Sequence, residues 1–248
     1  MIASVSVLAC IPARLASTRL KNKMLLEKHG IPLVVYTARS VQKTGCADQV
    51  LVAADHKDII DACRRFGIEA VMTSAEHSSG TDRINEAAGS NFETVINVQG
   101  DMPMVNSSCL QAVLKALEHA PMGTIAAPFK DRAQYLDTNK VKVLVNSAGL
   151  AAYFSRAALP FVRDTFSDSC LFTSVFHHLG IYAFRRDFLK IFTGLPRSTW
   201  ENAEKLEQLR ALQSGYAVGV EIIPDQLHEI DTTEDFNKFL EFPDNHNA

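Results

Sequence analysis

The first 130 residues alternate between short apolar runs and segments whose apolar residues recur every three or four positions. The runs predict buried strands, and the helical spacing predicts amphipathic helices. Strands are predicted at 5–11, 49–54, 69–72, 95–99 and 124–129, and helices at 32–43, 57–66, 81–88 and 107–119. This alternation predicts βαβ units and therefore an α/β fold with a mostly parallel sheet. The order of elements is that of a nucleotide-binding half-domain.

The pattern changes after residue 131. Two runs flank Asn-Ser-Ala-Gly at 146–149, which predicts an antiparallel hairpin. The predicted elements of this part are strands at 140–145, 151–154, 179–184 and 217–223 and helices at 201–214 and 233–242. Because no low-complexity linker interrupts the chain, we expect one domain over 1–248. It would comprise a nucleotide-binding half (1–130), an inserted antiparallel lobe (about 131–230) and a closing turn and helix (231–248).

Composition and charge exclude several classes of function. The 248 residues are 47% hydrophobic and 21% charged, as in ordinary soluble globular proteins. A net charge of -3 argues against nucleic acid as the main partner. The apolar N-terminus lacks the basic start of a signal peptide, and no apolar run is long enough for membrane insertion. The five cysteines form no CxxC pair, which is typical of reduced core residues in a cytosolic protein.

The most informative stretch is VINVQGDMP at 95–103, where a predicted buried strand ends in a glycine, a carboxylate and a proline. In open α/β sheets, ligands bind beyond the carboxyl ends of the strands. Asp101 at that position could hold a metal ion, with Gly100 allowing a close turn and Pro103 stiffening the chain. Alternatively, these residues form only a strand-ending turn, because Gly, Asp and Pro are common in turns.

A basic segment follows the first predicted strand. Arg14, Arg19, Lys21 and Lys23 lie within ten residues of a long loop, and such cations suit phosphate binding. The segment contains no glycine between Ile11 and Gly30, which argues against a G-x-G-x-x-G or Walker A loop. Phosphates would therefore be held by side chains. The alternative interpretation is a solvated basic loop.

Two further polar positions precede predicted helices. We interpret Asp55 as a cap for the helix at 57–66. The segment MTSAEHSSGTDR at 72–83 offers hydroxyl and backbone donors suited to a base or a phosphate, with Arg83 one helical turn later. Capping alone would also explain Ser79 or Thr81.

The ordered motifs of this chain resemble those of the bacterial 3-deoxy-manno-octulosonate (Kdo) cytidylyltransferases. They are IPARLASTRL at 11–20 with Lys23, HSSGTDR at 77–83, VQGDMP at 98–103, HLGIY at 178–182, LEQLR at 206–210 and IDTTED at 230–235. The resemblance runs from the first predicted strand to the last predicted helix. It implies a Rossmann-like (GT-A-like) nucleotidyltransferase fold whose inserted lobe binds sugar and mediates dimerisation. It also implies a cytoplasmic homodimer that transfers CMP from CTP to Kdo, an eight-carbon acid sugar, with Mg²⁺.

The resemblance also implies roles for individual residues. Lys23, Asp101 and Asp231 fall on catalytic positions, and the two aspartates fall on the magnesium ligands. The positions implied for the nucleotide are Arg14, Arg19, Lys23, Ser79, Gly80, Thr81 and Arg83. The positions implied for the sugar are Gln99, Arg163, His178, Tyr182 and Glu207.

Read without the resemblance, several of these residues have simpler interpretations. Asp231 precedes Thr-Thr-Glu-Asp, which resembles a helix capping box. His178 and Tyr182 could be satisfied polar residues of a strand, and Glu207 one charge on a helix face. His177 and His178 also suggest zinc, but no third ligand has the expected spacing.

The chain departs from the family pattern at two places. It has Lys21-Asn22 where the family usually has Pro-Gly, and Met102 where the family commonly has Glu or Gln. The first change alters the backbone freedom of the loop, and the second removes a polar group that we expect near the metal or the sugar. Two alternatives follow: the same reaction on a variant sugar such as 8-amino-3,8-dideoxy-manno-octulosonate, or a homologue that binds CTP without turnover.

Overall fold

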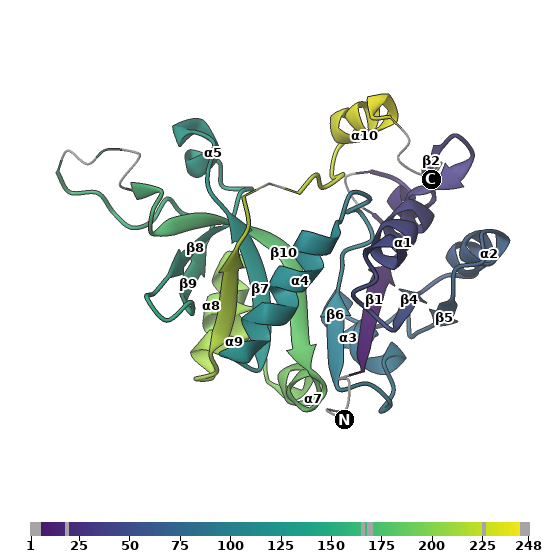
Figure 1. The fold of residues 1–248 in the computed structure, drawn as a ribbon, viewed down its shortest axis with the longest axis horizontal. Helices are drawn as coiled ribbons and strands as arrows, with labels where there is room; N and C mark the ends of the chain where they lie inside the picture. Colours follow the sequence, from purple (N-terminus) through teal and green to yellow (C-terminus); the bar gives the residue numbers. More distant parts are fainter. Residues whose placement is uncertain (1–5, 18–19, 165–166, 168–170, 225–226, 244–248) are drawn as a thin grey trace.

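The computed structural model describes residues 6–17, 20–164, 167, 171–224 and 227–243. These residues form a nine-stranded mixed sheet with helices on both faces (Figure 1). Its main path is β11-β7-β10-β6-β1-β4-β5, and the hairpin β8–β9 extends it from β10. The strands are β1 (Val7–Ala13), β4 (Gln49–Ala54), β5 (Ala70–Met72), β6 (Thr94–Asn97), β7 (Met122–Ala127), β8 (Lys142–Val145), β9 (Ala151–Ser155), β10 (Val175–Arg185) and β11 (Val218–Ile222). The predicted α/β class is confirmed.

The sheet combines parallel and antiparallel pairing. Strand β1 is parallel to both β4 and β6, and β7 is parallel to β11. The long strand β10 lies antiparallel between β6 and β7, and the predicted hairpin is present as β8–β9. The later part of the chain therefore inserts its longest strand into the middle of the sheet that the first part begins.

Burial on both faces explains why these strands read as continuous apolar runs. Along β1, Ala9 and Ile11 pack into the core on one face and Leu8 and Cys10 into the core on the other. The strand continues to Ala13, beyond its predicted end. Pro12 is tolerated because it lies past the last residue paired with β6.

Different helices cover the two faces of the sheet. Helices α1, α2 and α4 pack on one face, whereas α3, α7 and α9 contribute to the core of the other. The helices are α1 (Leu33–Thr44), α2 (Lys57–Arg65), α3 (Gly80–Ala87), α4 (Ser107–Lys115), α5 (Arg132–Leu136), α7 (Arg186–Gly194), α8 (Thr199–Glu204), α9 (Leu209–Gln213) and α10 (Thr233–Glu241). Among the described helices, none combines the length and apolar character needed to cross a bilayer.

The prediction of one helix at 201–214 is wrong. The chain forms α8 and α9 instead, because Lys205 adopts a left-handed conformation with φ of 55° that ends α8. Helices α5 and α7 were not predicted. Helix α7 begins at Arg186, directly after β10 ends at Arg185, so no glycine or proline marks the change from strand to helix, and only two charged residues separate the strand from the buried Phe188, Leu189 and Phe192.

Helix α10 is fastened to the first part of the chain by a buried lysine. The short hairpin of β2 (Glu27–Lys28) and β3 (Ile31–Pro32) precedes α1. The Lys28 ammonium donates to the carbonyl oxygens of Phe239, at 3.1 Å, and Phe242, and it lies 4.9 Å from the centroid of the Phe239 ring. Cations favour the C-terminal carbonyls of a helix. Tyr36 of α1 packs edge-on against Phe239.

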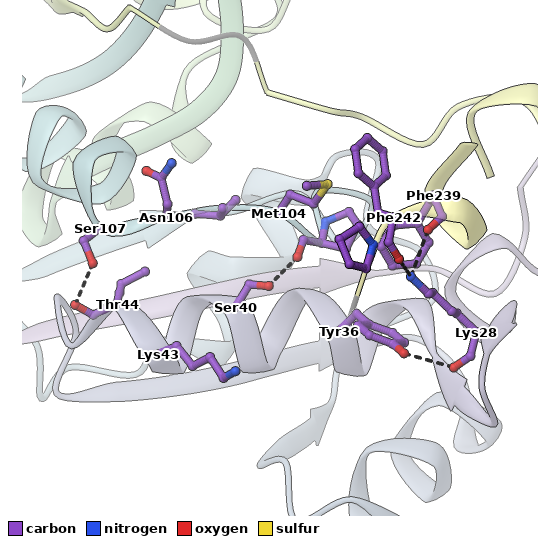
Figure 2. A pocket seen from close by; sticks show the side chains of 13 residues that line it. Lys28, Tyr36, Ser40, Lys43, Thr44, Met104, Asn106, Ser107, Phe239 and Phe242 are labelled. Atoms are coloured by element: carbon purple, nitrogen blue, oxygen red, sulfur yellow. Dashed lines mark hydrogen bonds between the residues drawn. The ribbon is translucent and has the colours of Figure 1, made fainter. Parts of the chain in front are cut away.

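A cavity of about 400 Å³ lies beside this contact (Figure 2). Its walls come from α1, from the segment around Met104 and from the end of α10, and Lys28, Tyr36 and Phe239 are among its lining residues. None of the residues singled out for catalysis or binding lines it.

Candidate active site

Three segments that are distant in sequence meet beyond the carboxyl end of β6. Lys23 lies on a single 3₁₀ turn (Lys23–Leu25), Asp101 follows β6, and Asp231 immediately precedes the N-cap residue of α10. The Lys23 ammonium donates to Asp101 Oδ2 in a very close contact and to Asp231 Oδ1 at 3.0 Å. The predicted catalytic trio is thus brought together, with both carboxylates directed at one positive charge.

The backbone around Asp101 is fixed on both sides. Thr37 of α1 donates to the carbonyl of Gly100 at 2.8 Å, and the carbonyl of Asp101 accepts the amide of Ile230 at 3.0 Å. Gly100 is closely packed, because a Cβ there would stand 2.6 Å from the Met24 sulfur, which would have to shift, and 3.3 Å from the carbonyl oxygen of Pro12. The predicted close turn is confirmed, and its hydrogen bond to Ile230 draws the segment carrying Asp231 toward Asp101.

The loop that carries Lys23 tolerates its departure from the family pattern. Asn22 stands where the family usually has glycine, and it adopts the left-handed conformation with φ of 52°. Asparagine enters this region more readily than other non-glycine residues. The loop therefore keeps the backbone shape that glycine would allow, and Lys23 reaches both aspartates.

The acidic cluster includes a residue that the sequence interpretation missed. Glu229 lies two residues before Asp231, with the buried Ile230 between them. Burial, with the negative charges of Asp101 and Asp231 nearby, raises the pKa of Glu229 to about 7. For Lys23, burial opposes the charged form, but the two aspartates outweigh it and raise the pKa. The sequence did contain a signal for Glu229. In an extended segment, side chains two residues apart point to the same side, so Glu229 is expected on the same side as Asp231, with Ile230 on the other.

A second cluster links β6 to α3 and to the start of α9. Gln99 donates to Asn97 at 3.1 Å, and Asn97 donates to the Thr81 hydroxyl at 3.4 Å. Thr81 in turn donates to Glu207 Oε2 at 2.8 Å. Burial raises the pKa of Glu207 against the effect of this hydrogen bond. Asn97 was not predicted as a site residue, although it lies in the same strand end as Gln99.

Tyr182 and His178 of β10 adjoin this cluster. Tyr182 is the register partner of both Asn97 and Thr124, and its ring lies 5.4 Å from the His178 ring. The Thr124 hydroxyl donates to the carbonyl of Ile181 at 2.8 Å, so His178 Nε2, at 3.0 Å, must be the donor toward Thr124. Burial lowers the pKa of His178 to about 3 and raises that of Tyr182, so both side chains are neutral near pH 7.

The segment before α3 acts partly as a structural cap. Ser79 is the N-cap residue of α3 and accepts the amide of Asp82 at 3.1 Å. Gly80 is packed closely, because a Cβ there would lie 3.1 Å from Pro12 Cγ. The capping alternative therefore accounts for the hydroxyl of Ser79, whereas that of Thr81 belongs to the cluster with Glu207.

Arg83 lies in the interior and has no exposed surface. It donates to the Thr73 hydroxyl, and its Nη2 is 3.5 Å from Asp55 Oδ2. The interpretation of Asp55 as a helix cap is wrong, because His56 caps α2 and Asp55 instead accepts the amide of Leu15 at 2.9 Å. In this conformation Arg83 offers no surface to a ligand, and with Asp55 it braces the base of the basic loop.

The remaining predicted residues are placed differently. Arg14 and Arg163 are exposed, and Arg163 lies in the segment between β9 and β10. Arg19 lies outside the described residues. Met102, expected near the metal or the sugar, is 2% exposed and packs in the core toward Gly180. Its side chain therefore lies in the core and does not face the site.

Zinc finds no support in the part of the chain that the structure describes. No group of three or more His, Cys, Asp or Glu side chains there could hold a metal ion. His177 is buried, and burial lowers its pKa to about 3. It packs beside the Phe129 ring, 5.8 Å between centroids.

Comparison with known proteins identifies the class. A model of the family described as Cytidylyltransferase matches residues 8–223. The 3-deoxy-manno-octulosonate cytidylyltransferase of Syntrophobacter fumaroxidans is 41% identical over 236 residues, covering 92% of this chain and 93% of that protein. The protein of the same name from Polynucleobacter necessarius is 42% identical over 239 residues, covering 93% of each.

Solved structures agree with this assignment. The structure of CMP:2-keto-3-deoxy-manno-octonic acid synthetase complexed with CTP is 32% identical, with a TM-score of 0.87, and covers 95% of this chain and 97% of that one. A cytidylyltransferase from Leptospira borgpetersenii shares the fold alone, at 15% identity and a TM-score of 0.60, covering 96% of this chain and 86% of that one. The chain therefore belongs to the 3-deoxy-manno-octulosonate cytidylyltransferases, within the larger cytidylyltransferase family.

Proposed function

We propose that this protein transfers CMP from CTP to the anomeric hydroxyl of Kdo and releases pyrophosphate, for lipopolysaccharide biosynthesis. The observation that carries the proposal is the convergence of Asp101, Asp231 and Lys23 beyond the end of β6. Membership of the family supports the choice of CTP and Kdo. The hydroxyl oxygen forms a bond to the α-phosphorus, the bond to the β-phosphate bridge breaks, and the hydroxyl proton leaves to solvent or a base.

The acidic residues fit a magnesium ion. Asp101 and Asp231 direct oxygens to one positively charged position, and Mg²⁺ prefers one or two carboxylates together with phosphate and water oxygens. We propose that these two residues hold it. When bound, Mg²⁺ would neutralise negative charge on the phosphates and lower the pKa of the sugar hydroxyl.

The protein's own side chains then divide the substrates between them. Lys23, Arg14 and Arg19 would neutralise the triphosphate and the departing pyrophosphate. The turn Ser79-Gly80-Thr81 would face the nucleotide, with Arg83 holding the loop beneath. Their contribution is positioning and electrostatic stabilisation, which attack on a phosphate requires more than covalent chemistry.

The sugar would lie against the second cluster. Gln99, Tyr182 and Glu207 offer mixed donors and acceptors for hydroxyl groups, and neutral His178 fixes the ring of Tyr182. Arg163, in the exposed segment before β10, would supply the cation for the sugar carboxylate.

The assembly and location belong to the same proposal. Phe161 is 89% exposed and Leu136 is 54% exposed on the inserted lobe, which supports a homodimer formed through that lobe. We expect the dimer to act in the cytoplasm, where CTP is available. Sedimentation velocity of the purified protein would test the dimer, and a single monomeric species at micromolar concentration would refute it.

The decisive experiment measures pyrophosphate release by the purified protein with CTP and magnesium. Kdo and its 8-amino analogue are offered in parallel, with UTP replacing CTP as the control. We expect release with CTP and Kdo, and little with UTP. Release only with the amino sugar would move the acceptor to that analogue, and CTP binding without release from either sugar would contradict the proposed activity.

A further inference from the structure

We propose that Lys23 occupies the cation position between Asp101 and Asp231 until nucleotide arrives, so that the divalent metal binds firmly only together with the triphosphate. This inference rests on the proposed function and concerns the order in which the site is assembled. It assigns to Lys23 a role in the free protein that differs from its role toward phosphate.

The first support is the geometry of the three side chains. One ammonium contacts an oxygen of each aspartate, so the position where the carboxylates converge already holds a positive charge. The side chain of Lys23 is 11% exposed and that of Asp101 is 20% exposed. The side chain of Asp231 is 38% exposed. A metal ion that binds the two contacted oxygens must therefore compete with a largely enclosed ammonium.

The second support is the small number of protein ligands. Within the described residues, no cluster of three or more His, Cys, Asp or Glu side chains could hold a metal. Two carboxylates leave most of the octahedral shell of Mg²⁺ to be filled by other oxygens. The phosphates of a nucleotide can supply them, whereas in the free protein the two carboxylates are already in contact with Lys23.

The triphosphate also gives the lysine a new partner. An enclosed ammonium that loses two carboxylates without replacement would be costly to leave unpaired. Phosphate oxygens next to the metal remove that cost. Hydrogen bonds from Lys23 N to Leu20 O and from Leu26 N to Lys23 O hold the backbone of the turn in place. The ammonium would therefore move from the carboxylates to the phosphates by rotation of the flexible lysine side chain.

A purely structural role for Lys23 makes the opposite prediction. If the lysine only braces the two aspartates, its removal lets them separate and weakens metal binding. If it competes with the metal, its removal takes the ammonium away from two adjacent carboxylates, and metal binding becomes tighter. The sign of the change therefore separates the two roles.

The test is titration of the protein with Mn²⁺ in the absence of nucleotide. Binding is measured by calorimetry and by the electron paramagnetic resonance signal of free Mn²⁺. Lys23→Met should bind at least ten times more tightly than the wild type. Lys23→Arg, which keeps a cation, should stay weak. Lys190→Met, a change at an exposed lysine of α7, serves as the matched control and should leave the affinity unchanged.

Circular dichroism and thermal unfolding of each variant establish that it is folded. The inference is overturned if folded Lys23→Met binds Mn²⁺ no more tightly than the wild type. It is also overturned if Lys23→Arg binds Mn²⁺ as tightly as Lys23→Met does. Pyrophosphate release by the wild type is measured separately. If the wild type turns over but Lys23→Met does not bind Mn²⁺ more tightly, only the ordered assembly is refuted. If Lys23→Met binds Mn²⁺ more tightly but the wild type shows no turnover, only the proposed activity is refuted.

Discussion

The two parts of the candidate active site handle charge in opposite ways. In one part, the Lys23 ammonium contacts the carboxylates of Asp101 and Asp231, and these partners outweigh burial and raise the pKa of Lys23. On the other side, burial raises the pKa values of Tyr182 and Glu207 and lowers that of His178, so it favours the neutral forms. Desolvation acts on both sides, but on the first it is opposed by direct contacts between one ammonium and two carboxylates, whereas the ion pair of Glu207 with Arg210 is longer, at 3.6 Å.

This contrast matches the two substrates that the site would receive. A triphosphate and its metal require fixed charges that can exchange partners. A sugar with many hydroxyl groups requires oriented donors and acceptors, which the chain from Gln99 through Asn97 and Thr81 to Glu207 provides. We therefore expect substitutions on the charged side to affect the rate of reaction, and those on the neutral side to affect sugar binding.

The largest effect is expected at the charged side. Asp101→Asn keeps the shape of the side chain but removes its charge, so one metal ligand and one partner of Lys23 are weakened. We expect kcat/KM to fall about 10³-fold, roughly 4 kcal/mol of transition-state stabilisation. Pyrophosphate release measures the loss, and exposed Asp187→Asn in α7 is the control. Activity within tenfold of the wild type would show that Asp101 is not a metal ligand.

A smaller and more selective effect is expected at Glu207. Glu207→Gln can still accept from Thr81 but loses its charge toward Arg210, whose Nη2 lies 3.6 Å from Oε1. The KM for Kdo should rise roughly tenfold, about 1.4 kcal/mol, while the KM for CTP changes less than threefold. Steady-state kinetics with each substrate varied in turn gives both values. A larger change for CTP would assign Glu207 to the nucleotide, and exposed Glu118→Gln is the control.

Burial of His177, the residue before His178 on β10, should also appear in the pH dependence of stability. The pKa of His177 falls from 6.5 to about 3 on burial, so below pH 6.5 the unfolded chain binds a proton that the native protein does not. Its stabilising contribution is complete above pH 6.5 and is lost as the pH falls toward 3. In His177→Phe this loss disappears. Between pH 5.5 and pH 4, the wild type should lose about 1.4 kcal/mol per pH unit more than the variant.

Urea unfolding of both proteins across that pH range measures the difference. Using the difference between wild type and variant removes the opposing contribution of Glu229, whose pKa is raised to about 7. Parallel stability curves would mean that His177 is not kept neutral by burial.

The smallest effect is expected at Met102, which lies in the core beneath both sides. Met102→Leu conserves volume and should cost less than about 1.5 kcal/mol of unfolding free energy. The ratio of kcat/KM for Kdo to that for the 8-amino sugar should stay within twofold of the wild type, because the side chain does not face the site. A changed ratio would return Met102 to the sugar pocket.

The sequence predicted much of the fold because apolar runs and helical spacing report burial directly. It failed where local signals were absent or misleading. Lys205 ends a helix in a segment whose apolar spacing continues, and α7 starts directly after β10 with no glycine or proline between them. These boundaries depend on tertiary packing that local patterns do not contain.

The site was predicted unevenly for the same reason. Motif resemblance located Lys23, Asp101 and Asp231, but it did not reveal that a single ammonium joins the two carboxylates. Asp55 looked like a helix cap because the residue before a helix often is one, whereas its partners, Leu15 and Arg83, are distant in sequence. Glu229 was missed because its raised pKa comes from burial and from neighbouring charges, which only the folded chain supplies.

The Lys28 contact sets a limit on how the end of this protein can be engineered. Chain ends usually tolerate truncation or fusion, because few buried contacts are lost. Here the carbonyls of Phe239 and Phe242 receive a buried ammonium from a residue 211 positions before the first of them. A fusion joined upstream of Phe242 would remove a carbonyl that accepts a hydrogen bond from Lys28, and it would destabilise helix α10, which follows Asp231. The earliest safe fusion point is thus set by a lysine near the other end of the chain.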